Sequence, residues 1–197
     1  MPRETEIKIR LNDAGALRER LEQVGGEFVG RVFETNRIFD TPDRSLFSRD
    51  CALRVRENRA RSDEPIRSST LTWKGPRIAG ELVRSREEIE LEIADAQAAT
   101  ALLARLGFRE RIVYEKRRET WRLDHCEIVL DELPRLGTFV EIEAADESRV
   151  LAARRELQLD RLPVEHETYV ALAAEQGDRG DNGSRSLTFS ATPPTMS

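Results

Sequence analysis

Charged and apolar side chains alternate from almost the first residue of the chain, and the charged ones could carry out chemistry. Every second position is held by Glu4, Glu6, Lys8 and Arg10. In an extended strand these side chains share one face, about 7 Å apart. Neighbouring carboxylates can hold a hard cation, and an ammonium can lie close to anionic oxygens. Taken alone, the stretch is more typical of a solvated edge strand that makes cross-strand ion pairs.

Charged side chains return at alternate positions in several later segments. The cations are Arg54, Arg56, Lys74, Arg84, Arg86, Lys116 and Arg118, and the carboxylates are Glu88, Glu90, Asp131, Glu141 and Glu143. Mutual ion pairing could satisfy them, but burying so many charges is costly unless each is well paired. Arginine and lysine bind phosphate oxygens through charge-assisted hydrogen bonds, and clustered carboxylates bind Mg²⁺ or Mn²⁺. The pattern therefore indicates phosphoryl-transfer chemistry on a polyanion held with a divalent cation.

The rarity of lysine marks three positions. Of the 32 basic residues only Lys8, Lys74 and Lys116 are lysines, and each falls on the charged face of a strand pattern. An ammonium is a compact charge whose pKa shifts readily on desolvation, which a guanidinium does not offer. We expect these three side chains to face the ligand.

About eight strands and several helices must position these groups. The strand patterns cover residues 4–11, 28–40, 51–57, 69–74, 82–93, 112–123, 127–131 and 139–144. Three of them lead into helical patterns, which end near residues 24, 106 and 157, and a last helix carries Tyr169, Val170 and Leu172. Charges on one face and aliphatics on the other allow an open sheet or a barrel with the charges inside.

Closure is the better solution because the helices can cover the apolar face. The fold class expected is α+β, an eight-stranded antiparallel closed β-barrel, or tunnel, with helices packed outside. The side chains expected to pack against the barrel are Leu17, Leu21, Leu102, Leu103 and Leu106.

Length and composition bound the remaining possibilities. The 197 residues suit one domain, residues 1–176, followed by a Gly-, Ser- and Pro-rich tail, 177–197, that we expect to be disordered. The net charge of −5 with interleaved signs gives no reason to expect nucleic-acid binding. No signal-peptide pattern or membrane span is apparent, so a cytoplasmic location is expected. Cys51 and Cys126 are isolated, which leaves oxygen ligands for any metal.

An ordered series of motifs resembles the CYTH superfamily, the triphosphate tunnel metalloenzymes. Residues 4–8 (ETEIK) match its E-x-E-x-K signature, and further blocks follow in the family's order up to about residue 170. These blocks are 39–42 (FDTP), 53–56 (LRVR), 71–76 (LTWKGP), 86–90 (REEIE), 116–118 (KRR) and 136–143 (LGTFVEIE). One departure is Ile38, where the family often has tyrosine. The resemblance implies a tunnel that binds a triphosphate with a divalent metal.

The resemblance also implies roles for individual residues. Metal ligands would be Glu4, Glu6, Glu141 and Glu143, with Asp131 and Glu90 as further candidates, and the metal would be Mg²⁺ or Mn²⁺. Triphosphate-binding residues would be Lys8, Arg54, Arg56, Lys74, Arg84, Arg86, Lys116 and Arg118. Lys8 and Glu6 are the candidates for direct participation in catalysis, Lys8 as a general base if its pKa is lowered.

The resemblance implies two possible reactions, and a non-enzymatic function is a further alternative. The family hydrolyses tripolyphosphate or thiamine triphosphate, or, as class IV adenylate cyclases, converts ATP to cyclic AMP and pyrophosphate. The blocks at 72–76 (TWKGP) and 114–118 (YEKRR) look most like the bacterial group named for the cyclase. That name is a weak guide to activity, because the blocks contact phosphates and leave the base unspecified, and we place hydrolysis slightly ahead of cyclisation. A binding module for polyphosphate or nucleotides, without turnover, is the second alternative. The sequence leaves monomer and homodimer both open.

Overall fold

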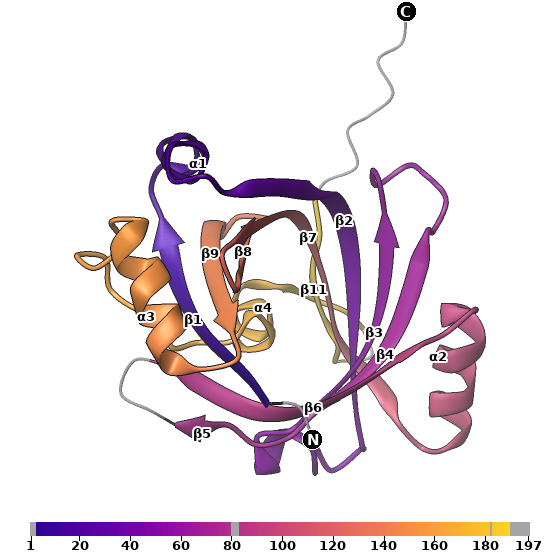
Figure 1. The fold of residues 1–197 in the computed structure, drawn as a ribbon. Coiled ribbons are helices and arrows are strands. Elements are labelled where there is room, and N and C mark those ends of the chain that lie inside the picture. Colours follow the sequence, from indigo (N-terminus) through magenta and orange to yellow (C-terminus); the bar gives the residue numbers. More distant parts are fainter. Residues whose placement is uncertain (1–2, 80–82, 182, 190–197) are drawn as a thin grey trace, which may run out of the picture.

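Eight antiparallel strands close into a barrel in the computed structural model, which describes residues 3–79, 83–181 and 183–189 (Figure 1). The strands are β1 (Arg3–Leu11), β2 (Glu27–Asp40), β3 (Ala52–Arg59), β4 (Ser68–Lys74), β6 (Arg84–Glu92), β7 (Arg109–Leu123), β8 (Cys126–Leu133) and β9 (Gly137–Ala144). Their order is β7-β2-β3-β4-β6-β1-β9-β8, and pairing of β8 with β7 closes the ring. The predicted fold is confirmed.

Four helices surround the barrel. They are α1 (Ala14–Gln23), α2 (Ala96–Arg105), α3 (Glu147–Glu156) and α4 (Tyr169–Gln176). The first three begin at Asp13, Asp95 and Asp146, whose carboxylates accept hydrogen bonds from backbone N–H groups of the first turn. A short 3-10 turn, η1 (Phe47–Arg49), and the two-residue strand β5 (Ile78–Ala79) lie at the rim. No helix in the described ranges is long and apolar enough to cross a membrane.

The alternation in β1 decides which side chains enter the barrel. Ile7 and Ile9 are fully buried in the outer core with Leu17 and Leu21 of α1, and burying such side chains contributes about 1.5–3 kcal/mol each. Glu6 and Lys8 therefore face the lumen. A slip of one residue in the pairing would exchange the two sets, so burial of the isoleucines fixes the register of the charged face.

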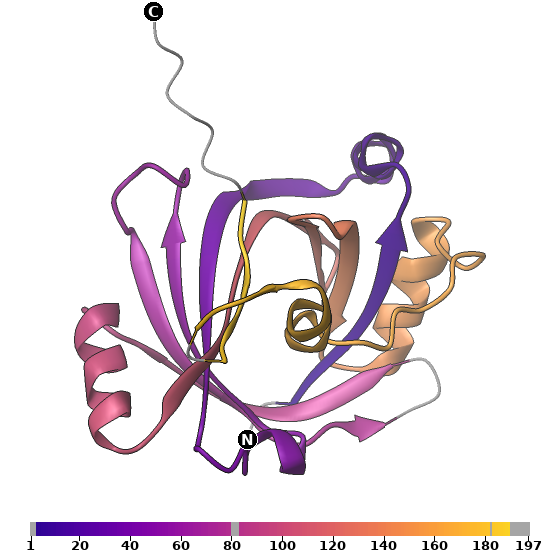
Figure 2. The same cartoon turned by 180° about the vertical axis from the view of Figure 1, so that it is seen from behind.

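Helix α4 covers one end of the barrel (Figure 2). Its Tyr169, Leu172 and Ala173 pack in an apolar cluster with strand residues of the barrel. The strand residues of this cluster include Ile38, Ile112, Tyr114, Leu133 and Phe139. The barrel interior thus contains apolar side chains next to α4 as well as charged ones, whereas the sequence pattern predicted charges inside the barrel.

The expectation of a disordered tail from residue 177 is wrong for its first part. Strands β10 (Asp178–Arg179) and β11 (Arg185–Leu187) form there, and β11 pairs in parallel with residues 112–114 of β7. Because β8 pairs with β7 only from Arg117 onward, this edge of β7 is open to another strand. Leu187 is fully buried. Residues 190–197 of the predicted tail lie outside the described residues.

The expected packing of α2 is only partly right. Ala96 and Leu103 are buried against the barrel, but Leu102 and Leu106 are 60% and 65% exposed. At about 100° per residue, Ala96 and Leu103 lie almost in line along the helix and face the barrel, whereas Leu102 is about 100° away from Leu103 and faces solvent, and Leu106 follows the last turn as the C-cap.

Candidate active site

A cavity of about 630 Å³ opens within the barrel. Its lining includes all eight side chains predicted to bind the triphosphate, namely Lys8, Arg54, Arg56, Lys74, Arg84, Arg86, Lys116 and Arg118. Of the predicted metal ligands, Glu6, Glu90, Glu141 and Glu143 also line it. The strands thus bring distant parts of the sequence to one charged cavity.

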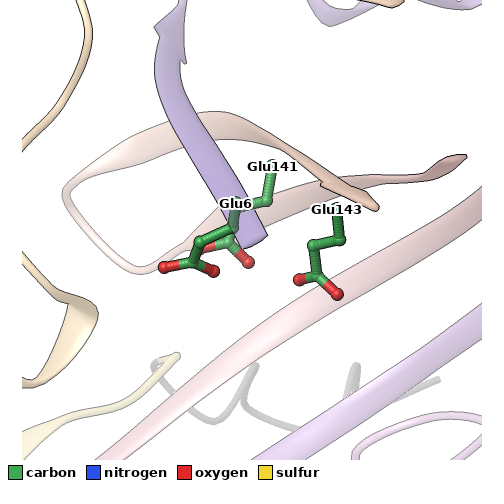
Figure 3. Close-up of side chains that lie close together, drawn as sticks. All are labelled: Glu6, Glu141 and Glu143. Carbon is green, nitrogen blue, oxygen red and sulfur yellow. The ribbon is translucent and has the colours of Figure 1, made fainter. Parts of the chain in front are cut away.

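Three of these carboxylates form a tight group. Glu6 of β1 lies opposite Glu143 of β9 in the strand register, and Lys8 lies opposite Glu141. One carboxylate oxygen of each glutamate lies within 4.8 Å of those of the other two, and the side chains lie on the same side of the two strands (Figure 3). Opposite oxygens around Mg²⁺ are about 4 Å apart, so a small contraction would let this oxygen-only set hold one hard divalent cation.

The electrostatics of the group point the same way. Burial raises the pKa of Glu141, and the negative charge of Glu6 raises it further. Arg118 and Lys8, 2.8 and 3.7 Å from Glu141, lower this pKa but do not outweigh the other two effects, so repulsion between the carboxylates remains. A divalent cation would remove that repulsion, which fits the role predicted for these three residues.

Glu90 and Asp131, also predicted to bind the metal, lie elsewhere. Glu90 accepts hydrogen bonds from Thr72 (2.8 Å) and from Arg54 (3.4 Å) on the wall formed by β3, β4 and β6. Asp131 is fully buried and its carboxylate binds Lys116 and Arg118. Glu4 of β1 pairs through its backbone with Arg86 of β6. The side chain of Glu4 lies outside the described part of the structure.

Asp131 and Glu34 form an anionic layer behind the cavity wall. Lys116 Nζ lies 2.9 Å from Asp131 and 3.4 Å from Glu34, and Arg118 donates to both oxygens of Asp131 at 2.6 and 2.8 Å. Burial alone would raise the pKa of both acids. For Asp131 the adjacent cations outweigh it and hold the pKa far below its usual range. The layer fixes the cations that face the cavity.

Sequence reasoning missed Glu34. Burial would raise its pKa, but the charges of Arg56, Lys116 and Arg118 outweigh it and lower the pKa to about 2. The available signal was the alternation of Glu34 and Asn36 in the strand pattern at 28–40, at positions that pair with Lys116 and Arg56. That pairing could not be known before the strand order.

The cations on β3 and β4 differ in the hydrogen-bond and ion-pair partners that they have within the protein. Arg54 reaches Thr72, Glu88 and Glu90 through one terminal nitrogen, whereas its buried Nε has no hydrogen-bond partner among the residues that the structure describes. Lys74 Nζ lies 2.8 Å from Glu88. An orphaned guanidinium N–H in a charged cavity fits an anionic ligand.

Arg84 lines the cavity and also makes contacts that the sequence did not predict. Its terminal nitrogens donate to the backbone carbonyls of His166 at 3.0 Å and Glu165 at 2.8 Å. These residues precede α4, so Arg84 fastens the segment that carries this helix. His166 itself lies before the first residue of α4.

Lys8 occupies the centre of the site. Its side chain is almost fully buried, with Nζ 3.7 Å from Glu141 and 3.9 Å from the centre of the Tyr169 ring. Burial lowers the pKa of Lys8, and the charges of Glu141 and Glu6 only partly oppose this. The direction of the shift is the one a general base requires.

The closed barrel, the wall of cations and the three glutamates together define a protein that takes up a polyanion with a divalent cation. The CYTH domain model matches residues 2–170, and the chain belongs to the CYTH family of enzymes, which bind triphosphates and depend on a metal.

Several known proteins resemble the chain. A candidate adenylate cyclase of Methanocaldococcus jannaschii is 31% identical over 140 residues, which cover 71% of this chain and 75% of that protein. The structure of the protein PH1819 from Pyrococcus horikoshii OT3 superposes with a TM-score of 0.74 at 30% identity, over 87% of this chain and 98% of that one. HpAC1 from Hippeastrum, described as having a dominant triphosphatase activity, shares the fold at 22% identity, with a TM-score of 0.68 over 86% of this chain and 94% of that one.

Proposed function

We propose that this protein is a divalent-metal-dependent triphosphatase that hydrolyses inorganic tripolyphosphate or an organic triphosphate such as thiamine triphosphate. The observation that carries the proposal is the group of Glu6, Glu141 and Glu143 beside a cavity lined by eight cations. A triphosphate needs several positive charges, and its hydrolysis needs stabilisation of charge that develops on the phosphoryl oxygens. Both requirements are met within one cavity.

The cavity residues would have different tasks in metal binding and phosphate binding. The three glutamates would hold Mg²⁺ or Mn²⁺, which supplies charge neutralisation and polarises a phosphoryl oxygen when bound. Arg54, Lys74 and Arg118 face the cavity from different strands and would neutralise and orient the phosphate chain. The anionic layer of Glu34 and Asp131 holds Lys116 and Arg118 in place.

Hydrolysis needs a group that accepts a proton from the attacking water. The water oxygen forms a bond to the terminal phosphorus, the bond to the bridging oxygen breaks, and a diphosphate leaves. Lys8, buried and of lowered pKa, is our candidate for the proton acceptor.

Adenylate cyclisation is the second candidate. The naming of the M. jannaschii relative supports it, and the cavity, at about 630 Å³, leaves room for an organic group beside the phosphates. In that reaction the ribose 3′-hydroxyl attacks the α-phosphorus and pyrophosphate leaves. The description of HpAC1 supports hydrolysis in a protein of this fold.

A product assay separates the two reactions. Purified protein is incubated with tripolyphosphate, ATP or thiamine triphosphate, each with Mg²⁺, Mn²⁺ or EDTA. We expect metal-dependent release of orthophosphate. Formation of cyclic AMP and pyrophosphate from ATP would mean that the reaction is cyclisation and not hydrolysis. Binding of all three substrates without any product would refute both reactions.

Substitution at the carboxylate group tests the site itself. Glu6→Gln keeps the shape and removes a ligand charge, so kcat/KM should fall about 100-fold or more with the unfolding midpoint retained. Lys74→Ala should likewise abolish turnover by removing a phosphate contact. The control is Glu132→Gln, since Glu132 is 47% exposed and pairs with Arg117 outside the barrel. Normal activity in both site variants would refute the tunnel mechanism.

A further inference from the structure

The buried end of the cavity under α4 contains polar groups that the roles assigned so far do not use. Thr168, Tyr169 and Val170, the N-cap and first two residues of α4, line the cavity. Tyr169 is 6% exposed, and no described residue meets hydrogen-bond geometry with its buried hydroxyl, although Asp131 lies close enough to act on it as an acceptor and helps to raise its pKa. An orphaned buried hydroxyl is costly, which suggests that a ligand satisfies it.

The backbone of the same turn offers further donors. The first N–H groups of a helix have no partner within it. Here Thr168 Oγ1 accepts from Ala171 N and the Thr168 carbonyl accepts from Leu172 N. This leaves the N–H groups of Tyr169 and Val170 at the positive end of the helix dipole, which favours anions.

Positive charges lie next to this turn. The ammonium of Lys8 is 3.9 Å and that of Lys116 is 5.2 Å from the centre of the Tyr169 ring. Burial raises the pKa of Tyr169, and the charges of Asp131 and Glu141 raise it further. The phenol therefore keeps its proton, and it can donate a hydrogen bond to an anion.

We propose that the first turn of α4 is a phosphate subsite, in which the Tyr169 hydroxyl and the N–H groups of Tyr169 and Val170 receive a phosphoryl group of the triphosphate. The inference rests on the proposed function, because it assumes that a triphosphate occupies the cavity. It makes α4 part of the binding site as well as the cover of the barrel end.

The competing role for the hydroxyl is structural, through Asp131. The oxygens of that carboxylate already accept three hydrogen bonds, from Lys116 and twice from Arg118. A phenol that served Asp131 would stabilise the folded protein, whereas a phenol that serves the ligand would not.

Tyr169→Phe separates these roles because it removes only the hydroxyl and keeps the ring beside Lys8. Tripolyphosphate binding is measured by calorimetry in EDTA, which avoids turnover, and the unfolding midpoint is measured without ligand. We expect affinity to fall about tenfold or more, as for a lost hydrogen bond to a charged group, while the midpoint stays or rises. Leu172→Ala, which removes packing from the same helix, should lower the midpoint and leave affinity within about twofold.

Two results would overturn the subsite: unchanged affinity in Tyr169→Phe, or a fall in both affinity and midpoint, which would indicate a structural hydroxyl. Failure of the proposed function is distinguishable from either. In that case the unmodified protein would bind tripolyphosphate without forming product. The calorimetric affinities of the unmodified protein and of Tyr169→Phe could still be compared.

Discussion

Two arginines of the cavity show that position on the inner face does not fix a role. Arg54 and Arg84 both line the cavity and both were predicted to bind phosphate. Within the described ranges Arg54 Nε has no hydrogen-bond partner, whereas Arg84 uses two nitrogens on the carbonyls of Glu165 and His166. Side-chain geometry of this kind does not follow from alternation in a sequence.

The two arginines should therefore respond differently to truncation. Arg84→Ala leaves two carbonyls without charged donors, so the free energy of unfolding should fall by about 2 kcal/mol. Arg54→Ala should instead weaken tripolyphosphate binding at least tenfold. Urea unfolding and calorimetry of both variants measure the two effects. Loss of affinity in Arg84→Ala as large as in Arg54→Ala would return Arg84 to the phosphate-binding set.

At the scale of elements, the sequence predicted the barrel strands well because their signal is local. Alternation assigned Glu6 and Lys8 to the inner face, and the lumen contains both. The sequence could not predict that α4 and β11 close one end. Composition made the tail look disordered, yet the open edge of β7 gives Arg185–Leu187 a partner. Glu34 was missed because its role, too, depends on contacts between distant segments, namely on which strand lies beside β2.

The order of β11 can be tested through its buried side chain. Leu187 is fully buried against the cluster that contains α4, so Leu187→Ala should lower the free energy of unfolding by about 2–4 kcal/mol. Leu102→Ala on α2 is the matched control because that side chain is 60% exposed, and its effect should stay within about 0.5 kcal/mol. Equal effects in chemical unfolding would mean that the tail does not pack.

For the whole molecule, the anionic layer behind the cavity makes stability depend on pH. Glu34 has a pKa of about 2 in the folded protein, against about 4.3 for an unperturbed glutamate. Asp131 is also held well below its usual pKa. An acid with a lowered folded pKa contributes its full stabilisation above the unfolded pKa and loses it as pH falls through the folded one.

The barrel should consequently lose stability between about pH 4.3 and pH 2, with Glu34 contributing on the order of 3 kcal/mol. Urea unfolding in EDTA across this range measures the loss. In Glu34→Gln the free energy of unfolding should be lower at pH 7, because Lys116 and Arg118 lose a buried counter-charge, and the gap to the unmodified protein should close towards pH 2. Glu132→Gln, altered at an exposed ion pair, should follow the unmodified curve. A gap that stays constant for Glu34→Gln would mean that this carboxylate does not hold the cation wall together, and Asp131 would then remain as the acid of the layer to test.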